Sequence, residues 1–148
     1  MDKFITKDFQ ETQNLGISLA QAILREGLQK QAVVLAMRGD LGSGKTTFLQ
    51  GFAKGLGIAQ VVNSPTFVIM KKFEIENAEF KYLYHFDLYR LEDEKDLEFL
   101  AIPELVKDPK NIIAIEWPEK IVSKLNQPII NIVCQHQENQ TRELTIER

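Results

Sequence analysis

The sequence predicts an α/β domain with three layers, in which helices cover both faces of a mixed β-sheet. An apolar run at residues 32–37 has the composition of a strand buried on both faces, and a glycine-rich loop and an amphipathic helix follow it. Residues 66–74 and 80–87 are rich in aromatic and β-branched side chains, as in an antiparallel hairpin. The chain has 148 residues, 44% of them hydrophobic, which suffices for one compact core, so we expect a single domain over residues 1–148.

The first half of the chain carries the signals for two helices and one buried strand. Asp8 and Glu11 have the spacing of a capping box, and apolar residues then repeat at helical intervals until Gly27. After the strand at 32–37, a second helix begins at Lys45 and ends near Gly55. We expect the parallel core of the sheet to form around this strand, loop and helix.

The second half of the chain supplies the remaining strands. The alternation of Phe80, Tyr82, Tyr84 and Phe86 indicates an antiparallel strand with two different faces, not a parallel strand buried on both sides. The sum is a mixed sheet with a parallel core and attached antiparallel hairpins. The other expected elements are a short helix over 92–100, a connection containing Pro103, a strand over 111–116, a helix from Pro118 to about Leu125, and strands over 129–135 and 142–146.

Residues 39–46 read Gly-Asp-Leu-Gly-Ser-Gly-Lys-Thr, which matches the phosphate-binding loop G-x-x-x-x-G-K-[ST] at every fixed position. Glycines let successive N–H groups wrap a phosphate, and the following helix adds unpaired donors and its positive dipole end. A glycine-rich turn that merely caps a helix leaves the Gly-Lys-Thr spacing unexplained. The loop therefore predicts a nucleoside triphosphate site, with the Lys45 ammonium on the β and γ phosphates and the Thr46 hydroxyl on Mg²⁺. The predicted nucleotide-binding residues here are Asp40, Leu41, Gly42, Ser43, Gly44, Lys45, Thr46 and Thr47.

Two acidic residues compete for the second half of such a site. A phosphate loop needs a carboxylate that orients Mg²⁺ or the attacking water, and parallel strands deliver such groups at their carboxyl ends. Glu116 ends the apolar run 112–115, as in a Walker B strand with Glu in place of the usual Asp, and is the expected Mg²⁺-side ligand. Asp87 ends the aromatic strand and is a candidate catalytic acid. Either residue also fits an exposed acid at a strand end.

Other polar and aromatic residues fit both a functional and a structural role. Thr66 lies in a Ser-Pro-Thr segment where switch loops place a hydroxyl on Mg²⁺ or the γ-phosphate, but an ordinary turn explains the same residues. Trp117 fits a contact with nucleotide or partner, or a core anchor. His85 fits a hydrogen-bonded structural residue. Arg90 either neutralises phosphate charge or pairs with a nearby carboxylate.

The composition excludes several classes of function. The net charge is −3 and there is no basic cluster beyond Lys71 and Lys72, so a protein that grips nucleic acid by itself is not expected. The single Cys134 excludes an intramolecular disulfide and fits a buried core thiol, and with two His residues no zinc-type cluster is expected. No apolar stretch approaches a bilayer span and the start lacks a secretory signal, so we expect a cytoplasmic protein with no membrane partner.

Four motifs, taken together, resemble the TsaE family (formerly YjeE) of small bacterial P-loop ATPases. They are residues 39–46, Asn-Ser-Pro-Thr-Phe at 63–67, His-Phe-Asp-Leu-Tyr-Arg at 85–90, and Ile-Glu-Trp-Pro-Glu at 115–119. The resemblance covers nearly the whole chain and implies one P-loop NTPase domain. It also implies a role in forming threonylcarbamoyladenosine beside the anticodon of tRNAs that read codons beginning with A.

The resemblance further implies partners and residue roles. In that family, Mg²⁺-dependent hydrolysis of ATP to ADP serves a complex that contains the threonylcarbamoyl-transferring subunit TsaD and its paralogue TsaB, and resets it between turnovers. ATP hydrolysis is then slow without these partners, and the protein contacts tRNA only through them. By position, the implied roles are phosphate and Mg²⁺ binding by Lys45 and Thr46, a switch-like loop at Thr66, catalytic and Mg²⁺-side acids at Asp87 and Glu116, a nucleotide contact at Trp117, and a base or ribose contact at Thr12 in the Thr-x-x-Leu-Gly pattern of 12–16.

Three other functions share the phosphate loop. A small-molecule kinase would need an acceptor pocket and an arginine-bearing lid, for which only Arg90 is available in the middle of the chain. A GTP switch would need an Asn-Lys-x-Asp guanine reader, which the sequence lacks. A nucleotide-binding scaffold without hydrolysis also fits the loop.

Overall fold

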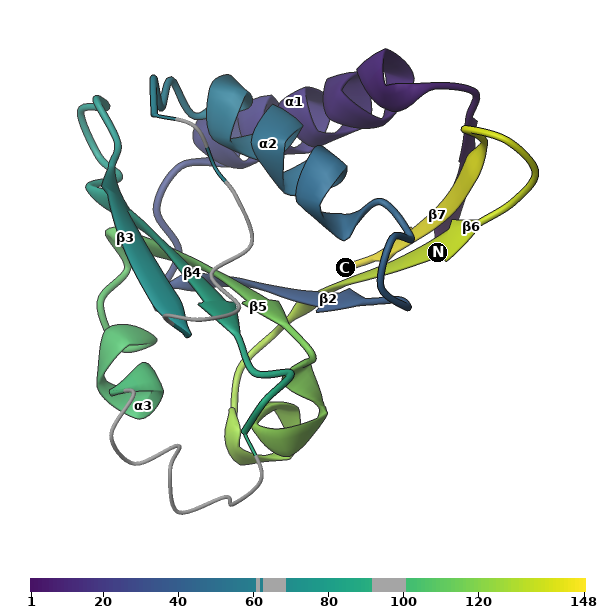
Figure 1. The fold of residues 1–148 in the computed structure, drawn as a ribbon. Coiled ribbons are helices and arrows are strands. Elements are labelled where there is room, and N and C mark those ends of the chain that lie inside the picture. The colour runs from purple at the N-terminus through teal and green to yellow at the C-terminus, as the bar shows by residue number, and fades with distance from the viewer. Residues whose placement is uncertain (61, 63–68, 92–100) are drawn as a thin grey trace.

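A single mixed sheet lies between two layers of helices (Figure 1). The computed structural model describes residues 1–60, 62, 69–91 and 101–148. Within them the seven strands follow the order β1-β7-β6-β2-β5-β4-β3. The elements are β1 (Asp2–Thr6), α1 (Phe9–Glu26), β2 (Val33–Arg38), α2 (Lys45–Gly55), β3 (Met70–Glu74), β4 (Tyr82–Asp87), α3 (Ile102–Leu105), β5 (Asn111–Glu116), the 3₁₀ turns η2 (Pro118–Lys120) and η3 (Val122–Lys124), β6 (Ile130–His136) and β7 (Arg142–Glu147).

The middle of the sheet is parallel and its edges are antiparallel. Strand β2 pairs in parallel with both β5 and β6, and β4 pairs in parallel with β5. The antiparallel strands are β3 at one edge and β7 and β1 at the other. This arrangement confirms the predicted parallel core with antiparallel hairpins.

Each face of the sheet carries its own apolar cluster. Helices α1 and α2 cover one face, where they pack on residues such as Leu35, Leu83 and Ile112. Helix α3 and the segment around η2 and η3 cover the other face, over residues such as Phe86 and Ile113. Because alternate residues of the central strands enter the two clusters, the sheet is buried on both sides and the three-layer prediction is confirmed.

Strand β4 corrects one prediction from the sequence. It pairs antiparallel with β3 but parallel with β5, and both of its faces are buried. Leu83 enters the cluster under α1 and α2, whereas Tyr84 and Phe86 enter the opposite cluster. The two faces of the strand therefore differ in the apolar cluster that each one enters, and both are buried. The expectation that this strand is not a parallel strand buried on both sides was wrong, because β5 pairs with it in parallel and helices cover both faces of the sheet.

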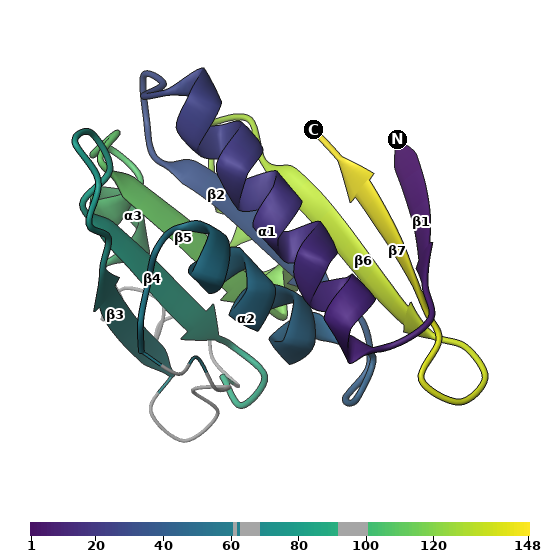
Figure 2. The same ribbon diagram turned by 90° about the horizontal axis from the view of Figure 1, so that it is seen from above.

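Helices α1 and α2 pack with almost no space between their backbones. A Cβ on Gly51 would lie 2.0 Å from the carbonyl oxygen of Gln13, and one on Gly16 would lie 2.2 Å from that of Phe48. Figure 2 shows the two helices lying alongside each other over the sheet. The glycine of the Thr-x-x-Leu-Gly pattern is therefore required by close helix packing, and this contact holds α2 in place.

The start of α1 has the predicted cap. The Asp8 carboxylate accepts a hydrogen bond from the Glu11 backbone N–H at 2.8 Å, and the Glu11 side chain accepts one from the Lys7 N–H at 2.6 Å. The helix ends at Gly27, which has a φ of 76°. These contacts satisfy backbone groups that a helix leaves unpaired at its ends.

Several short elements differ from the sequence prediction. No strand is predicted before α1, yet β1 pairs with β7 at the sheet edge, where the pairing compensates for a segment with little buried surface. The connection containing Pro103 holds helix α3. The helix predicted from Pro118 to about Leu125 is instead the two 3₁₀ turns η2 and η3, which are separated by Ile121 with a φ of −118° and end before the extended Leu125. The helix predicted over 92–100 lies outside the described residues.

The lone thiol is part of the core. Cys134 is buried in the cluster under α1 and α2, as predicted. Burial raises the pKa of its thiol to about 12, so the thiol stays protonated and unreactive at neutral pH. None of the helices among the described residues is long and apolar enough to span a bilayer.

The contact between α1 and α2 gives the first testable prediction. Gly51→Ala should lower the free energy of unfolding by about 1–3 kcal/mol, because a methyl group has no room against the α1 backbone. Urea denaturation measures this loss. Ser18→Ala on the exposed face of α1 is the control and should change stability little. Equal stability of the Gly51 variant and the wild type would contradict the close packing.

Candidate functional site

The phosphate-loop segment joins β2 to α2 through three glycines with positive φ. Gly39, Gly42 and Gly44 have φ values of 142°, 77° and 111°, which side-chain-bearing residues rarely adopt. A Cβ on Gly39 would also lie 2.3 Å from the carbonyl oxygen of Cys134. Gly44 is the N-cap of α2, and no side chain among the described residues caps the helix there. The first N–H groups of α2 are therefore available to an anion.

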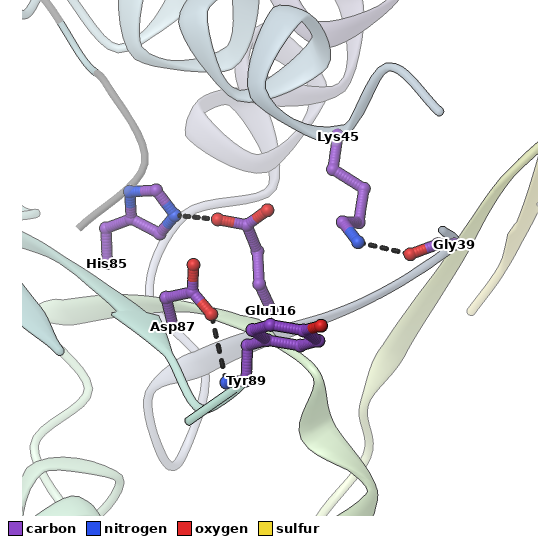
Figure 3. A network of polar contacts seen from close by, with 6 residues as sticks. All are labelled: Gly39, Lys45, His85, Asp87, Tyr89 and Glu116. Carbon is purple, nitrogen blue, oxygen red and sulfur yellow. Dashed lines mark hydrogen bonds and ion pairs between the residues drawn. The ribbon is translucent and has the colours of Figure 1, made fainter. Parts of the chain in front are cut away.

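Lys45 lies inside the loop and not on its surface. The residue is only 5% exposed, and its ammonium donates a hydrogen bond to the Gly39 carbonyl (Figure 3). The same ammonium lies 4.3 Å from the centre of the Trp117 ring. Trp117 in turn packs against Tyr89, with ring centres 4.9 Å apart. The aromatic pair fixes the lysine in the mouth of the loop by a cation–π contact.

The other residues of the loop divide into a tip and a base. Asp40 and Leu41 are exposed, and the Asp40 carbonyl accepts the Ser43 N–H at 3.0 Å. Thr46 and Thr47 are half-buried in the first turn of α2. This geometry places the Thr46 hydroxyl at the positive end of the helix, directly after the lysine.

Strand register brings the two candidate acids together beside this loop. Glu116 pairs with Met37 at the end of β2 on one side and with Asp87 at the end of β4 on the other. Both carboxylates point to the face covered by α2, since Ile112 and Leu83, at even spacings before them, pack there. The side chains are almost fully buried, with Glu116 3% and Asp87 5% exposed. Two carboxylates thus lie at the carboxyl ends of adjacent parallel strands, next to the phosphate loop.

Each acid is oriented by a neighbouring group. The Nε2 atom of His85 lies 2.7 Å from Oε2 of Glu116, and because a carboxylate only accepts, this nitrogen carries the proton (Figure 3). The Oδ1 atom of Asp87 accepts the Tyr89 N–H at 3.0 Å. The other His85 nitrogen, Nδ1, is buried with no hydrogen-bond partner within the described residues. The acids are held in fixed positions before any ligand binds, which favours function over a solvated strand end.

The donor set suits Mg²⁺ better than a transition metal. The Thr46 hydroxyl and the Glu116 carboxylate offer hard oxygen ligands, and no group of three or more His, Cys, Asp or Glu among the described residues could hold a metal alone. An ion that keeps several waters and phosphate oxygens fits two protein ligands of this kind.

Comparisons with known proteins agree with the geometry of this site. A family model described as threonylcarbamoyl adenosine biosynthesis protein TsaE matches residues 6–144. The chain belongs to the TsaE family. Among the family's curated members, the tRNA threonylcarbamoyladenosine biosynthesis protein TsaE of Bacillus subtilis (strain 168) is 42% identical over 126 residues, which are 85% of this chain and 76% of that protein. The protein of the same name from Nostoc sp. is 36% identical over 148 residues, 99% of this chain and 85% of that one.

A solved structure supports the same assignment. The crystal structure of Bacillus subtilis YdiB matches with a TM-score of 0.74 and 32% identity, over 98% of this chain and 83% of that chain. The predicted P-loop NTPase fold is thereby confirmed for this TsaE-family chain.

Thr12 and Thr66, whose roles the TsaE resemblance implies, keep these roles as predictions. Thr12 is 1% exposed, and its hydroxyl lies 2.7 Å from that of Thr6 while also donating to the Asp8 carbonyl at 3.2 Å. A direct contact of this side chain with base or ribose stays a prediction that these bonds do not favour. Thr66 lies outside the described residues, so its switch role also stays a prediction.

Sequence reasoning gave little or no weight to two other residues that lie beside the phosphate loop or the acids. His85 was assigned a structural role, although its position two residues before Asp87 on a strand already put both side chains on one face. Arg142 was not selected at all, because only the fold brings the start of β7 to the phosphate loop. No local pattern in the sequence marks that contact.

The His85–Glu116 bond gives the second prediction. His85→Leu should lower the free energy of unfolding by about 2–4 kcal/mol, since it leaves a buried carboxylate without its donor. His85→Gln, which keeps a donor, should lose less. A double-mutant cycle with Glu116→Gln, followed by urea denaturation, should give a coupling energy of about 1 kcal/mol or more. Strictly additive effects would show that the two side chains do not interact.

Proposed function

We propose that this protein is a Mg²⁺-dependent ATPase that hydrolyses ATP to ADP and phosphate during threonylcarbamoyladenosine formation in tRNAs that read codons beginning with A. The observation that carries the proposal is the register that sets Glu116 and Asp87 beside the loop holding Lys45. The relatives named for threonylcarbamoyladenosine biosynthesis support the tRNA role. We treat residues 1–148 as one P-loop ATPase domain.

Binding of ATP follows from the loop and helix α2. The backbone N–H groups of residues 40–47 wrap the phosphates, and the helix dipole favours their negative charge. Lys45 exchanges its bond with the Gly39 carbonyl for phosphate oxygens, at little cost because it is already buried and held by Trp117. Thr46 and Glu116 would hold Mg²⁺, which neutralises charge on the transferred phosphoryl group.

Hydrolysis requires a positioned water, and the chain offers two groups for this task. Asp87 ends the strand next to Glu116, and its Oδ1 atom accepts the Tyr89 N–H. Thr66 is the second candidate for this role. His85 keeps Glu116 fixed through the 2.7 Å bond, so the acid does not need to reorganise as charge develops.

Coupling to a partner complex is the second part of the proposal. The partner is the threonylcarbamoyl-transfer complex of TsaD and TsaB, which ATP hydrolysis resets between turnovers. The protein contacts tRNA indirectly, through this complex. The net charge of −3 supports an indirect contact with tRNA. Leu41 is exposed in the phosphate loop, and Tyr89 is exposed where it packs against Trp117. Both side chains offer apolar surface for a partner. We place this activity in the cytoplasm, where tRNA is modified.

The lysine provides the third prediction. Lys45→Ala should weaken binding of a fluorescent ATP analogue by about a hundredfold, because the loop loses its only buried ammonium among the described residues. Lys54→Ala, on the exposed side of the same helix, is the matched control and should bind normally. Unchanged affinity of the Lys45 variant, with the fold intact by circular dichroism, would contradict the phosphate-loop assignment.

The acids and the partner complex provide the fourth prediction. Glu116→Gln and Asp87→Asn should bind ATP but lose most phosphate release, about a hundredfold. Wild-type hydrolysis should be slow alone and rise when TsaD, TsaB and tRNA are added, and a pull-down should recover the complex. Rapid ATP hydrolysis by the isolated protein, with no stimulation by the partners, would contradict coupling to the complex.

Transfer of a labelled γ-phosphate from ATP to an added metabolite, instead of to water, would identify a kinase.

A further inference from the structure

The outer edge of β1 is an open strand edge with exposed apolar side chains. Within the described residues β1 pairs only with β7, and Figure 2 shows it as the last strand on its side of the sheet. Of the seven exposed large apolar residues that the structure describes, four lie within the first nine positions, and these are Met1, Phe4, Ile5 and Phe9. An unpaired edge of this kind is a template for a further strand.

The opposite edge of the sheet is better protected against pairing. Strand β3 carries two adjacent lysines, Lys71 and Lys72, and none of the seven exposed large apolar residues. Lysines on an edge strand discourage pairing with another chain. Strand β1 has one lysine, Lys3, and its ammonium lies 3.2 Å from Oε1 of Glu143 on β7. Because this ion pair compensates the charge of Lys3, β1 is the less protected of the two edges.

The side chains of β1 alternate between the two faces of the sheet. Thr6 faces α1, since its hydroxyl lies 2.7 Å from that of Thr12, and Phe4 shares this face. Ile5 points to the opposite face, where no residue of β1 belongs to the apolar cluster. The exposed fractions are 36% for Phe4 and 55% for Ile5. A strand added beside β1 would therefore cover apolar surface on both faces of the sheet.

The sequence of β1 suits antiparallel pairing with a second copy of itself. When Phe4 lies opposite Phe4 of the second copy, Lys3 lies opposite Ile5, and all five residues of the strand are paired. A register with Lys3 opposite Lys3 pairs like charges, and one with Ile5 opposite Ile5 leaves part of the strand unpaired. A shift by one residue would set side chains of opposite faces against each other. The register centred on Phe4 is thus favoured.

We propose that two copies of this chain associate through β1, with the two β1 strands antiparallel and Phe4 opposite Phe4, so that the two sheets become continuous. The same edge serves both copies, which makes the contact symmetric and closed. Each copy contributes a strand of five residues, so the interface is small and the dimer is weak and dependent on concentration.

Sedimentation equilibrium tests the association at protein concentrations of about 10 to 500 µM. The average mass of the wild type should rise from that of one chain, 17.0 kDa, toward twice that value. Ile5→Lys places a second lysine on the edge and should weaken association by about tenfold or more. Leu28→Lys, at an exposed apolar position after α1, is the matched control and should associate like the wild type.

Cysteine cross-linking tests the register. Phe4→Cys should form a disulfide between two copies on oxidation with diamide, because residues directly opposite in an antiparallel pair have Cα atoms about 4.5–5.5 Å apart. Lys3→Cys should cross-link about tenfold more slowly, since the two copies of this position are only diagonal neighbours, roughly 7–8 Å apart. The native Cys134 is buried and does not compete.

Several results would overturn the dimer. They are a wild type that keeps the mass of one chain at every concentration, an association that Ile5→Lys leaves unchanged, and an equal loss in Ile5→Lys and Leu28→Lys. Equal cross-linking rates of Phe4→Cys and Lys3→Cys would overturn the register. Circular dichroism of each variant checks that its fold is intact before these comparisons are made.

Discussion

The site depends on the parallel pairing of β5 with β2 on one side and with β4 on the other. In this register Glu116, the last residue of β5, lies beside Met37 of the strand that enters the phosphate loop, and Asp87, the last residue of β4, lies beside Glu116. A shift of one residue in either pair would turn a carboxylate to the opposite face of the sheet, away from α2. The apolar residues of both strand faces prevent such a shift, because each alternate set is buried in its own cluster. Burial of the core therefore fixes the positions of the polar groups.

The second constraint is the position of α2, whose first turn continues the loop. Backbone contact with α1 at Gly16 and Gly51 holds the helix from above, and Phe48 and Phe52 anchor it to the sheet below. This rigid support matters because anion binding by backbone N–H groups needs fixed directions, not flexible side chains. The glycines of α1 and α2 thus serve the loop indirectly, through packing that leaves no space for a side chain.

The electrostatics of the site are divided across the loop. Buried acids lie on the β5 and β4 side, with Glu116 held by His85, while Lys45 and Arg142 bring positive charge to the loop itself. Burial strengthens each of these interactions, because the low dielectric of the interior screens them less than water does. Burial also raises the free-energy cost of each unpaired charged group, so a ligand of opposite charge stabilises the site more strongly. Preorganised charge of both signs in one place is unusual for a purely structural region and is typical of a catalytic one.

The sequence by itself determined the fold class, the phosphate loop and the strand ends that carry the two acids. These are local properties, because glycine spacing and apolar runs are read from neighbouring residues. It misjudged β4, missed β1 and assigned a helix to 118–125, since sheet neighbours and covering helices decide exposure and regularity at those places. Only the tertiary structure decided that His85 holds Glu116, that Trp117 packs on Lys45, and that Arg142 reaches Gly44. The physical reason is that these contacts join residues far apart in the chain, and strand register and helix packing alone bring them within reach of one another.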